Sequence, residues 1–426
     1  MSHNIKRNIS DHILHYSRHN LFSFDKMYRL KALDLLPEEE LQQQSEKEAM
    51  KMIRFAAERS EFYRNLYPRN ALDGNFKESY EALPVIDKLD VREHEKTIST
   101  LPLRLLKKGR TSGTTGTPLT VYRSLSANIK EYAYVWYYRM QHGLKKGDPI
   151  LSLRSKLNRD QLFHYNKAEN ILYFSPFLLS RQNIDKLMLV LADFKPKAIL
   201  AYPSYIFNLV HLLNEKNFKI KVPLVFTSSE TLHHYQRAKI EDFFGGRIFD
   251  WYGNVERTIA LGQCDYGTYH EMPLYSYNEF TEGGVITTSL TNKAYPLIKY
   301  FVDDTITMMQ EPCICGKNKG VKAIEGRMTD SLVLKDGTYM SGVSVGYSFI
   351  DVKNIRLAQI IQNTPDRIDV NVVPGEHFSQ YDQTHLLNNL KLRLPVDISI
   401  GFHKVAEEGI IKSKSGKFKL VVSDFK

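Results

Sequence analysis

Short apolar runs alternate with amphipathic stretches through the middle of the chain. Apolar runs of about five residues predict buried strands, and apolar positions at helical spacing predict helices between them. In chain order these elements are a strand at 197–201, a helix at 205–215, a strand at 223–227, a helix at 232–244 and a strand at 247–251. Strands that alternate with helices predict an α/β fold with mostly parallel sheets and flanking helices.

The two ends of the chain have different patterns. Residues 36–66 include three consecutive glutamates near their start and carry apolar residues at helical spacing, which predicts a helical lead-in to a large N-terminal domain. After Asp330 the pattern of apolar and polar residues changes. Alternating apolar and polar residues predict strands at 368–372 and 396–400, with a helix at 382–392 between them. We therefore expect a large domain over 1–326 and a small α+β domain over 327–426.

Polar side chains follow the predicted strands. These positions are Tyr202, Ser229, Glu230, Tyr252 and Gly253. Because ligands of parallel α/β sheets bind beyond the carboxyl ends of strands, we expect a binding site there. We also expect Tyr202, Ser204 and Trp251 to line the pocket for the substrate.

One loop is rich in glycine and hydroxyl groups. It consists of Thr111, Ser112, Gly113, Thr114, Thr115 and Gly116. Its glycines let the backbone approach phosphate oxygens, and its hydroxyls add hydrogen-bond donors. No Gly-Lys-Ser/Thr sequence follows, so this is not a Walker loop. Taken alone, the loop is also compatible with an ordinary Ser/Thr/Gly surface loop.

Five segments in register carry a family resemblance. They are residues 111–118, 229–230, 252–256, 326–330 and 415–417. Together they resemble the adenylate-forming superfamily, and within it the phenylacetate-CoA ligase group, over nearly the whole chain. Residues 110–113 and 118–122 look closer to the CapK-like capsular polysaccharide branch of that group. The resemblance implies an ATP-dependent, AMP-forming ligase with a large adenylation domain and a small mobile C-terminal domain.

The resemblance also implies roles for single residues. The Thr/Gly loop would hold the β- and γ-phosphates of ATP, with Thr115 taking part in catalysis. The ring of Tyr252 would stack on adenine beside Gly253, and a buried core tyrosine is the alternative. Glu256 would bind Mg²⁺ and contribute to catalysis, and a solvated carboxylate at a helix start is the alternative.

For the rest of the nucleotide, the resemblance implies that Ser229 and Glu230 line its edge and that Asp304 binds the ribose hydroxyls. The sequence departs from the family here. Lys299 stands where members usually carry Arg, and Asp303 stands where they usually carry Gly. Asp303 therefore stays open as a rival for the ribose role.

Two further positions concern movement of the small domain. Arg327 would bind phosphate or ribose, and Asp330 would be the hinge about which the small domain turns, although a plain linker turn is the alternative. Lys417 would contact the substrate carboxylate and phosphate during adenylation once the small domain closes. Other lysines lie near it, so a solvated basic strand is the competing interpretation.

All three cysteines fall within a short part of the chain. Cys264, Cys313 and Cys315, together with His270, form the ligand set of a closed tetrahedral zinc site. Gly316 permits a turn after the Cys-x-Cys pair. We expect a structural zinc ion, which members of the resembled group often carry, with buried free thiols as the alternative.

Composition and charge limit the classes of partner and the cellular location that we expect for the protein. The net charge of +10 comes from scattered Lys and Arg without a long basic block, so we expect no nucleic-acid partner and assign the charge to phosphates of ATP and CoA. No stretch is apolar enough for a membrane span, and residues 1–18 are polar and not signal-like, so we expect a cytoplasmic protein. The oligomeric state stays open, with a homodimer as one option.

Three hypotheses for the function follow. The leading one is a ligase that forms acyl-AMP from a small carboxylic acid, releases pyrophosphate and passes the acyl group to CoA or to an amine or sugar acceptor, in surface polysaccharide biosynthesis if the CapK-like branch applies. The second is a nucleotidyl transferase that attaches AMP to a cofactor or carrier. The third is a non-catalytic nucleotide-binding protein. The sequence does not name the acid or its acceptor.

Overall fold

The computed structural model describes most of the chain, which forms two units. The described residues are 21–68, 70–110, 119–154, 157, 161–281, 283–325, 332–335, 339–340, 342–349, 352, 354–411 and 420–423. The first unit contains Met1–Arg110, Leu119–Lys145 and Trp251–Glu325. The second contains Thr111–Pro118, Lys146–Asp250 and Gly326–Lys426.

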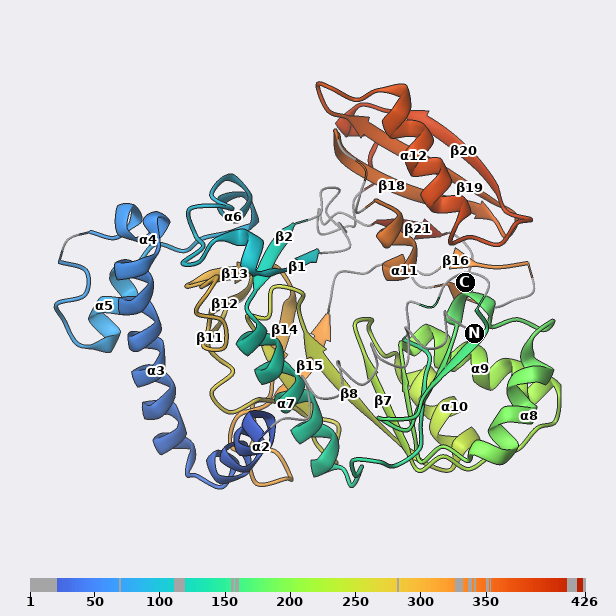
Figure 1. Cartoon of the computed structure of the whole chain (residues 1–426), viewed down its shortest axis with the longest axis horizontal. Helices are drawn as coiled ribbons and strands as arrows, with labels where there is room; N and C mark the ends of the chain where they lie inside the picture. Colours follow the sequence, from blue (N-terminus) through green and yellow to red (C-terminus); the bar gives the residue numbers. More distant parts are fainter. Residues whose placement is uncertain are drawn as a thin grey trace. The chain divides into compact units, whose positions relative to one another are not determined.

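Helices dominate the start of the first unit. They are α2 (Leu21–Asp34), α3 (Glu38–Arg59), α4 (Glu61–Leu66), α5 (Phe76–Ala82), α6 (Lys88–Glu93), the 3-10 turn η1 (Leu103–Leu105) and α7 (Leu125–Gln141). In Figure 1, α2 lies beside α7. The single helix expected over 36–66 is broken at Ser60, whose backbone is extended and whose hydroxyl accepts a hydrogen bond from the backbone of Tyr63. Ser60 therefore ends α3 and caps α4.

The strands of the first unit are mainly antiparallel. They are β1 (Lys107–Arg110), β2 (Thr120–Arg123), β9 (Ala260–Gln263), β10 (Tyr269–Glu271), β11 (Ser276–Thr281), β12 (Gly284–Ser289), β13 (Tyr300–Val302), β14 (Thr305–Met308) and β15 (Val321–Glu325). β1 pairs with β2, and β11, β12 and β13 form a second sheet. A third sheet contains, in spatial order, β14, β15, β10 and β9. In this sheet β9 also pairs with the last residues of β8 (Arg247–Gly253).

Tyrosines fill much of the core of the first unit. Tyr63, Tyr80, Tyr295 and Tyr300 are each at most 1% exposed. The Tyr63 phenol donates to the carbonyl of Pro296 at 3.1 Å, and the Tyr80 and Thr288 hydroxyls lie 3.1 Å apart. A ring with a polar tip can fill a core when that tip finds a partner, as the tips of Tyr63, Tyr80 and Tyr300 do, whereas the buried hydroxyl of Tyr295 has none among the described residues.

The second unit contains the parallel strands that the apolar runs predict. Its middle part comprises β3 (Ile150–Ser152), β4 (Phe163–Asn166), β5 (Ile171–Phe174), η2 (Pro176–Leu178), α8 (Ile184–Phe194), β6 (Ala198–Ala201), α9 (Pro203–Glu215), β7 (Leu224–Ser228), α10 (His234–Phe244) and the start of β8. β3 is parallel to both β5 and β6, and β6 is parallel to β7. Gly245 ends α10 in the left-handed conformation. The predicted α/β fold class is confirmed.

The C-terminal part of the second unit is a small α+β structure. It comprises β16 (Leu332–Val333), β17 (Tyr339–Met340), α11 (Gly342–Gly346), η3 (Tyr347–Phe349), β18 (Ile355–Thr364), β19 (Arg367–Pro374), α12 (Gln380–Lys391), β20 (Ser399–Lys404), η4 (Glu407–Gly409) and β21 (Val421–Ser423). The sheet order is β20, β19, β18, β21, and α12 lies on this sheet (Figure 1). The strand expected at 396–400 begins three residues later, because Ser399 pairs with Arg367 while Val396 stays exposed. The expected boundary at 326 and 327 lies outside the described residues, so the domain division stays a prediction.

Candidate functional site

The carboxyl end of β8 brings two expected nucleotide residues together in the first unit. The phenol of Tyr252 donates a 2.7 Å hydrogen bond to Oδ2 of Asp304, which follows β13 in the chain. Pairing of Tyr252 with Leu261 and of Gly253 with Ala260 holds this end of β8. The ring of Trp251 lies 5.2 Å from that of Tyr138. Tyr252 therefore contacts Asp304, the residue preferred over Asp303 for the ribose.

Lys299, which stands in the family's arginine position, points into the core of the first unit. Only 6% of this residue is exposed, and its ammonium donates to the carbonyl of Tyr80 at 2.8 Å. The same ammonium lies 4.8 Å from the centroid of the Tyr80 ring. Burial lowers the pKa of Lys299 from its ordinary value. The contacts of this lysine thus lie within the core, and both Asp303 and Asp304 remain candidates for binding the sugar hydroxyls.

Glu256 sits in a tight turn directly after β8. It is 8% exposed, and its Oε1 accepts a 3.1 Å hydrogen bond from the Tyr300 phenol. Among the described residues no hydrogen bond reaches its Oε2. A buried carboxylate with one oxygen still available fits the hard-cation ligand that Mg²⁺ requires.

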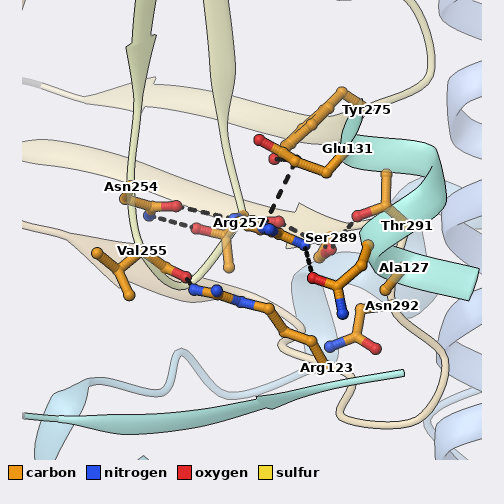
Figure 2. A network of polar contacts seen from close by, with 12 residues as sticks. Arg123, Ala127, Glu131, Asn254, Val255, Arg257, Tyr275, Ser289, Thr291 and Asn292 are labelled. Carbon is orange, nitrogen blue, oxygen red and sulfur yellow. Dashed lines mark hydrogen bonds and ion pairs between the residues drawn. The ribbon is translucent and has the colours of Figure 1, made fainter. Parts of the chain in front are cut away.

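A network of polar contacts surrounds this turn (Figure 2). The side chain of Asn254 accepts from the backbone of Thr258 at 2.9 Å, which closes the turn. Arg123 donates to the carbonyl of Val255, and Arg257 donates to Asn128 at 2.9 Å. Neither arginine was anticipated from sequence. The position of Arg257 next to Glu256 was the only available signal.

The strand ends of the second unit hold other expected residues. Ser204 lies in the first turn of α9, and the Glu230 carboxylate accepts from its backbone N–H at 3.0 Å and from its hydroxyl at 3.2 Å. Ser229 precedes Glu230 and has a left-handed backbone, with φ of 72°. Glu230 thus contacts the positive end of a helix, where a carboxylate is stabilised. Its contact with Ser204 joins a residue expected at the nucleotide to a residue expected at the substrate pocket.

Tyr202 lies at the same ends of the parallel strands. It follows β6, and the guanidinium of Arg154, which comes shortly after β3, lies 5.3 Å from the centroid of its ring. Tyr202 also stacks on Tyr205, with ring centroids 5.8 Å apart. An aromatic ring covered by a cation suits a wall of a polar substrate pocket.

The three cysteines and one histidine come together in the first unit. The ligand atoms of Cys264, His270, Cys313 and Cys315 all lie within 4.8 Å of one another. The sulfurs of Cys264 and Cys313 are 3.8 Å apart, and the sulfur of Cys315 is 3.2 Å from Nε2 of His270. Thiolates at about 2.3 Å from a tetrahedral zinc ion require roughly this separation. The donor set and its spacing fit zinc.

The surroundings of this cluster also suit a metal. Nδ1 of His270 lies 2.9 Å from the carbonyl of Lys319 and must donate to it, which leaves Nε2 with its lone pair toward the cysteines. Burial lowers the pKa of His270, which favours the neutral ring. Lys317 forms a 2.9 Å ion pair with Asp34, and the backbone of Asn318 donates to Glu38 at 2.6 Å. The loop between Cys313 and Lys319 is therefore fixed to α2 and α3.

Some expected residues lie outside the described part of the chain. They are Thr111, Ser112, Gly113, Thr114, Thr115 and Gly116 of the Thr/Gly loop, Arg327, the hinge residue Asp330, and Lys417. The strands β1 and β2 on either side of the loop are described, and Arg110 pairs with Thr120. The roles of the loop, hinge and lysine remain expectations.

Sequence comparison finds relatives over the whole chain. Residues 332–424 match the CapK C-terminal domain. The chain is 24% identical to Protein CapK of Staphylococcus aureus, over 99% of this chain and 97% of that protein. It is 22% identical to a phenylacetate-coenzyme A ligase of Thermus thermophilus, over 81% of this chain and 84% of that enzyme. The chain is therefore a homologue of Protein CapK and of this phenylacetate-coenzyme A ligase.

Solved structures share the fold of this chain. A 2-hydroxyisobutyryl-CoA ligase in complex with 2-HIB-AMP and CoA, in the thioesterification state, has a TM-score of 0.61 at 16% identity and covers 91% of each chain. The same ligase in the postadenylation state with R3-HIB-AMP has a TM-score of 0.57 at 16% identity, over 92% of this chain and 91% of that one. Of the helices that the structure describes, none is long and apolar enough to pass through a lipid bilayer.

Proposed function

We propose that the chain is an ATP-dependent, AMP-forming ligase that activates a small carboxylic acid as an acyl-adenylate. The hydrogen bond between Tyr252 and Asp304 carries this proposal. It joins the residue expected to stack on adenine to the residue expected to bind ribose. Glu256 follows in the same turn and offers a carboxylate oxygen for a cation. The residues expected to perform these three functions all belong to one unit, which supports binding of a magnesium–nucleotide complex.

The nucleoside would be held by the first two of these residues. The Tyr252 ring offers a flat face to adenine, and its phenol is fixed by the bond to Asp304. A carboxylate can accept several hydrogen bonds, so Asp304 can accept from Tyr252 and from a ribose hydroxyl. In the second unit, Ser229 and Glu230 would line the edge of the nucleotide, and Tyr202 and Ser204 would line the pocket for the acid.

The reaction requires control of negative charge. A carboxylate oxygen of the acid forms a bond to the α-phosphorus of ATP, and the bond from that phosphorus to pyrophosphate breaks. Bound Mg²⁺ would offset charge on the phosphates, and Glu256 would hold it. The Thr/Gly loop with Thr115 would donate to the β- and γ-phosphates, and Lys417 would supply a cation beside the reacting oxygens. As the small domain closes, Arg327 would bind phosphate or ribose, and Asp330 would be the hinge about which this domain turns.

The acyl-adenylate would then react with an acceptor nucleophile. The thiol of CoA would attack the acyl carbon, its proton would leave, and AMP would depart. CoA is supported by the ligase of similar fold that was solved with an acyl-AMP and CoA. An amine or sugar acceptor in surface polysaccharide biosynthesis is the alternative that the relationship to Protein CapK suggests.

We further propose that Cys264, His270, Cys313 and Cys315 hold a structural zinc ion. All four positions for ligands are filled by the chain, which is typical of structural sites and leaves none for a substrate. The ion would join β9 and β10 to the loop that contacts α2 and α3.

The test is ATP–pyrophosphate exchange with a panel of aryl, fatty, hydroxy and amino acids. We expect at least one acid to support exchange, and Lys417→Ala to abolish it. Adding CoA, glucosamine or another amine and identifying the product by mass spectrometry names the acceptor. No exchange with any acid, together with AMP retained in a product, would instead favour an AMP transferase. Exchange that is equal in wild type and Lys417→Ala would contradict the adenylation mechanism.

A further inference from the structure

Arg257 has a backbone conformation that needs support. Its φ is 57°, in the left-handed region that L side chains rarely adopt. Arg257 follows Glu256 directly. The backbone conformation of Arg257 therefore affects the direction that the chain takes at Glu256. Its N–H donates to the carbonyl of Asn254 at 3.2 Å, and its carbonyl accepts from the Ser289 hydroxyl at 3.1 Å. Both backbone groups of Arg257 are therefore fixed.

The side chain of Arg257 is anchored to helix α7. Its Nη1 donates to Asn128 at 2.9 Å, and its Nε lies 3.8 Å from the carboxylate of Glu131 (Figure 2). Glu131 also accepts a 2.5 Å hydrogen bond from the phenol of Tyr275. The side chains of Arg257 and Glu131 are 18% and 19% exposed. At this burial the ion pair is only partly screened, so it holds the turn more firmly than a surface pair.

Arg123 anchors the same turn from the opposite end. It is the last residue of β2, and its guanidinium donates to the carbonyl of Val255, directly before Glu256. Its guanidinium packs against Gly109 of β1, where a Cβ would collide with it. Burial and, to a smaller extent, the nearby Arg257 together lower the pKa of Arg123 to about 10, so Arg123 stays protonated at neutral pH. The two arginines thus hold the residues on both sides of Glu256.

We propose that Arg257 and Arg123 are positioning residues that hold the Glu256 turn so that its carboxylate is presented to the magnesium ion of Mg·ATP. The proposal rests on the function proposed above. Residues that orient a metal ligand affect metal binding through that ligand, whereas residues that only stabilise the fold do not. A positioning role and a purely stabilising role therefore predict different effects of an arginine substitution on metal binding once Glu256 itself has been replaced.

Binding of Mn²⁺ in the presence of ATP, followed by the electron paramagnetic resonance signal of free Mn²⁺, tests the proposal without an acid substrate. Arg257→Gly removes the anchor but accepts the left-handed backbone, so it should fold. We expect its Mn²⁺ affinity to fall about tenfold. The Mn²⁺ affinities of Arg257→Lys and Asn128→Ala should fall less. Arg123→Ala should also weaken binding, because it frees the Val255 carbonyl.

Arg237→Ala is the matched control. Arg237 also contacts a carboxylate, Glu241, and a backbone carbonyl, that of Ile248, and its side chain is 22% exposed. It belongs to α10 in the second unit, away from the Glu256 turn in sequence. We expect Arg237→Ala to change the unfolding temperature without changing Mn²⁺ affinity.

A double-mutant cycle with Glu256→Gln separates positioning from general stability. If Arg257 acts through Glu256, Arg257→Gly should cause no further loss of Mn²⁺ affinity in the Glu256→Gln background. An equal loss in both backgrounds, or no loss in either, overturns the proposal. If Arg257→Gly does not fold, Asn128→Ala takes its place in the cycle and decides in the same way.

The wild-type result distinguishes this inference from the proposed function. If wild type and ATP bind no Mn²⁺, or if Glu256→Gln binds it as well as wild type does, the proposed role of Glu256 and this inference both fail. If wild type binds Mn²⁺ through Glu256 but the Arg257 and Asn128 variants bind it equally well, only the positioning inference fails.

Discussion

The phenol of Tyr252 donates a 2.7 Å hydrogen bond to the carboxylate of Asp304, which lies 52 residues further along the chain. The bond connects the end of β8 to the turn between β13 and β14. A ring and a carboxylate that share a hydrogen bond do not adjust independently. Recognition of adenine and recognition of ribose are therefore coupled in the proposed site.

Tyr252→Phe tests this coupling. The variant keeps the ring but removes the donor, so we expect ATP to bind roughly five- to tenfold more weakly, as loss of a hydrogen bond to a charged group predicts. Isothermal titration calorimetry with Mg·ATP measures the effect. Tyr165→Phe is the matched control, because its phenol contacts Asn170 at an exposed site. Equal affinities for ATP in wild type and Tyr252→Phe would contradict the coupling.

The two neighbouring aspartates can be separated by the same measurement. Asp304→Asn removes a charge that accepts from Tyr252, and we expect it to weaken ATP binding about tenfold or more. Asp303→Asn should change the affinity less. If ATP and deoxy-ATP bind Asp304→Asn as they bind wild type, while Asp303→Asn loses affinity for ATP, Asp303 holds the ribose instead.

Glu230→Gln examines the contact with the start of α9. The glutamate accepts from the backbone and hydroxyl of Ser204, and its charge opposes the positive end of the helix. We expect the amide to lower the free energy of unfolding by about 1 kcal/mol, measured by urea denaturation. Glu376→Gln, at an exposed loop position, is the control. A loss of ATP affinity without a loss of stability would assign Glu230 to the nucleotide alone.

Removal of the proposed zinc ion should destabilise the first unit. We expect purified protein to contain about one zinc ion per chain, and a chelator or Cys264→Ser to lower the unfolding temperature by several degrees. Metal analysis and thermal denaturation measure both effects. His377→Ala, at an exposed histidine outside the cluster, should retain the metal. Metal-free protein in which all three thiols react freely would disprove the site.

Lys26 gives the chain a specific dependence on pH. Burial and, to a smaller extent, the neighbouring Lys130 together lower its pKa from 10.5 to about 8. Between about pH 8 and pH 10.5 the unfolded chain keeps a proton that the folded chain has lost, so this group makes the folded state more stable as pH rises. Lys26→Met should therefore stabilise the protein at pH 7, on the order of 1 to 2 kcal/mol.

The stabilising effect of Lys26→Met should shrink as pH rises toward 10.5, where the folded and unfolded wild-type chains both lose the proton. Urea denaturation at pH 7, 8.5 and 10 measures the trend. Lys391→Met, at an exposed position on α12, is the control. A constant difference between Lys26→Met and wild type across this range would contradict the buried cation.

Much of the fold follows from local patterns. Residues 198–201 of the run at 197–201 are all apolar, and all four residues of β6 are buried, so this local pattern alone was sufficient. The break at Ser60 was missed because apolar residues continue at helical spacing on both sides of it. The strand at 399–404 was misplaced because alternation does not specify where pairing begins, which depends on Arg367 in another strand.

The candidate site shows the same division. The cysteine cluster was predictable because the thiols are scarce and their chemistry is specific. The two positioning arginines were not, because Asn128 is 129 residues from Arg257 and Val255 is 132 residues from Arg123. The left-handed backbone at Arg257 could not be predicted from the residue type, because arginine rarely adopts this conformation. Such long-range polar contacts depend on the assembled structure.

The close packing of Gly109 against Arg123 has a genetic consequence. The two residues share one volume, so any side chain at position 109 displaces the guanidinium from the Val255 carbonyl. In a saturation-mutagenesis library selected for activity, alleles at codon 109 should therefore be depleted to the extent that activity depends on the Arg123 anchor, because moving the end of a flexible arginine is itself cheap. A smaller residue at codon 123 should relieve the crowding in such alleles without restoring activity, since the anchor is then absent as well.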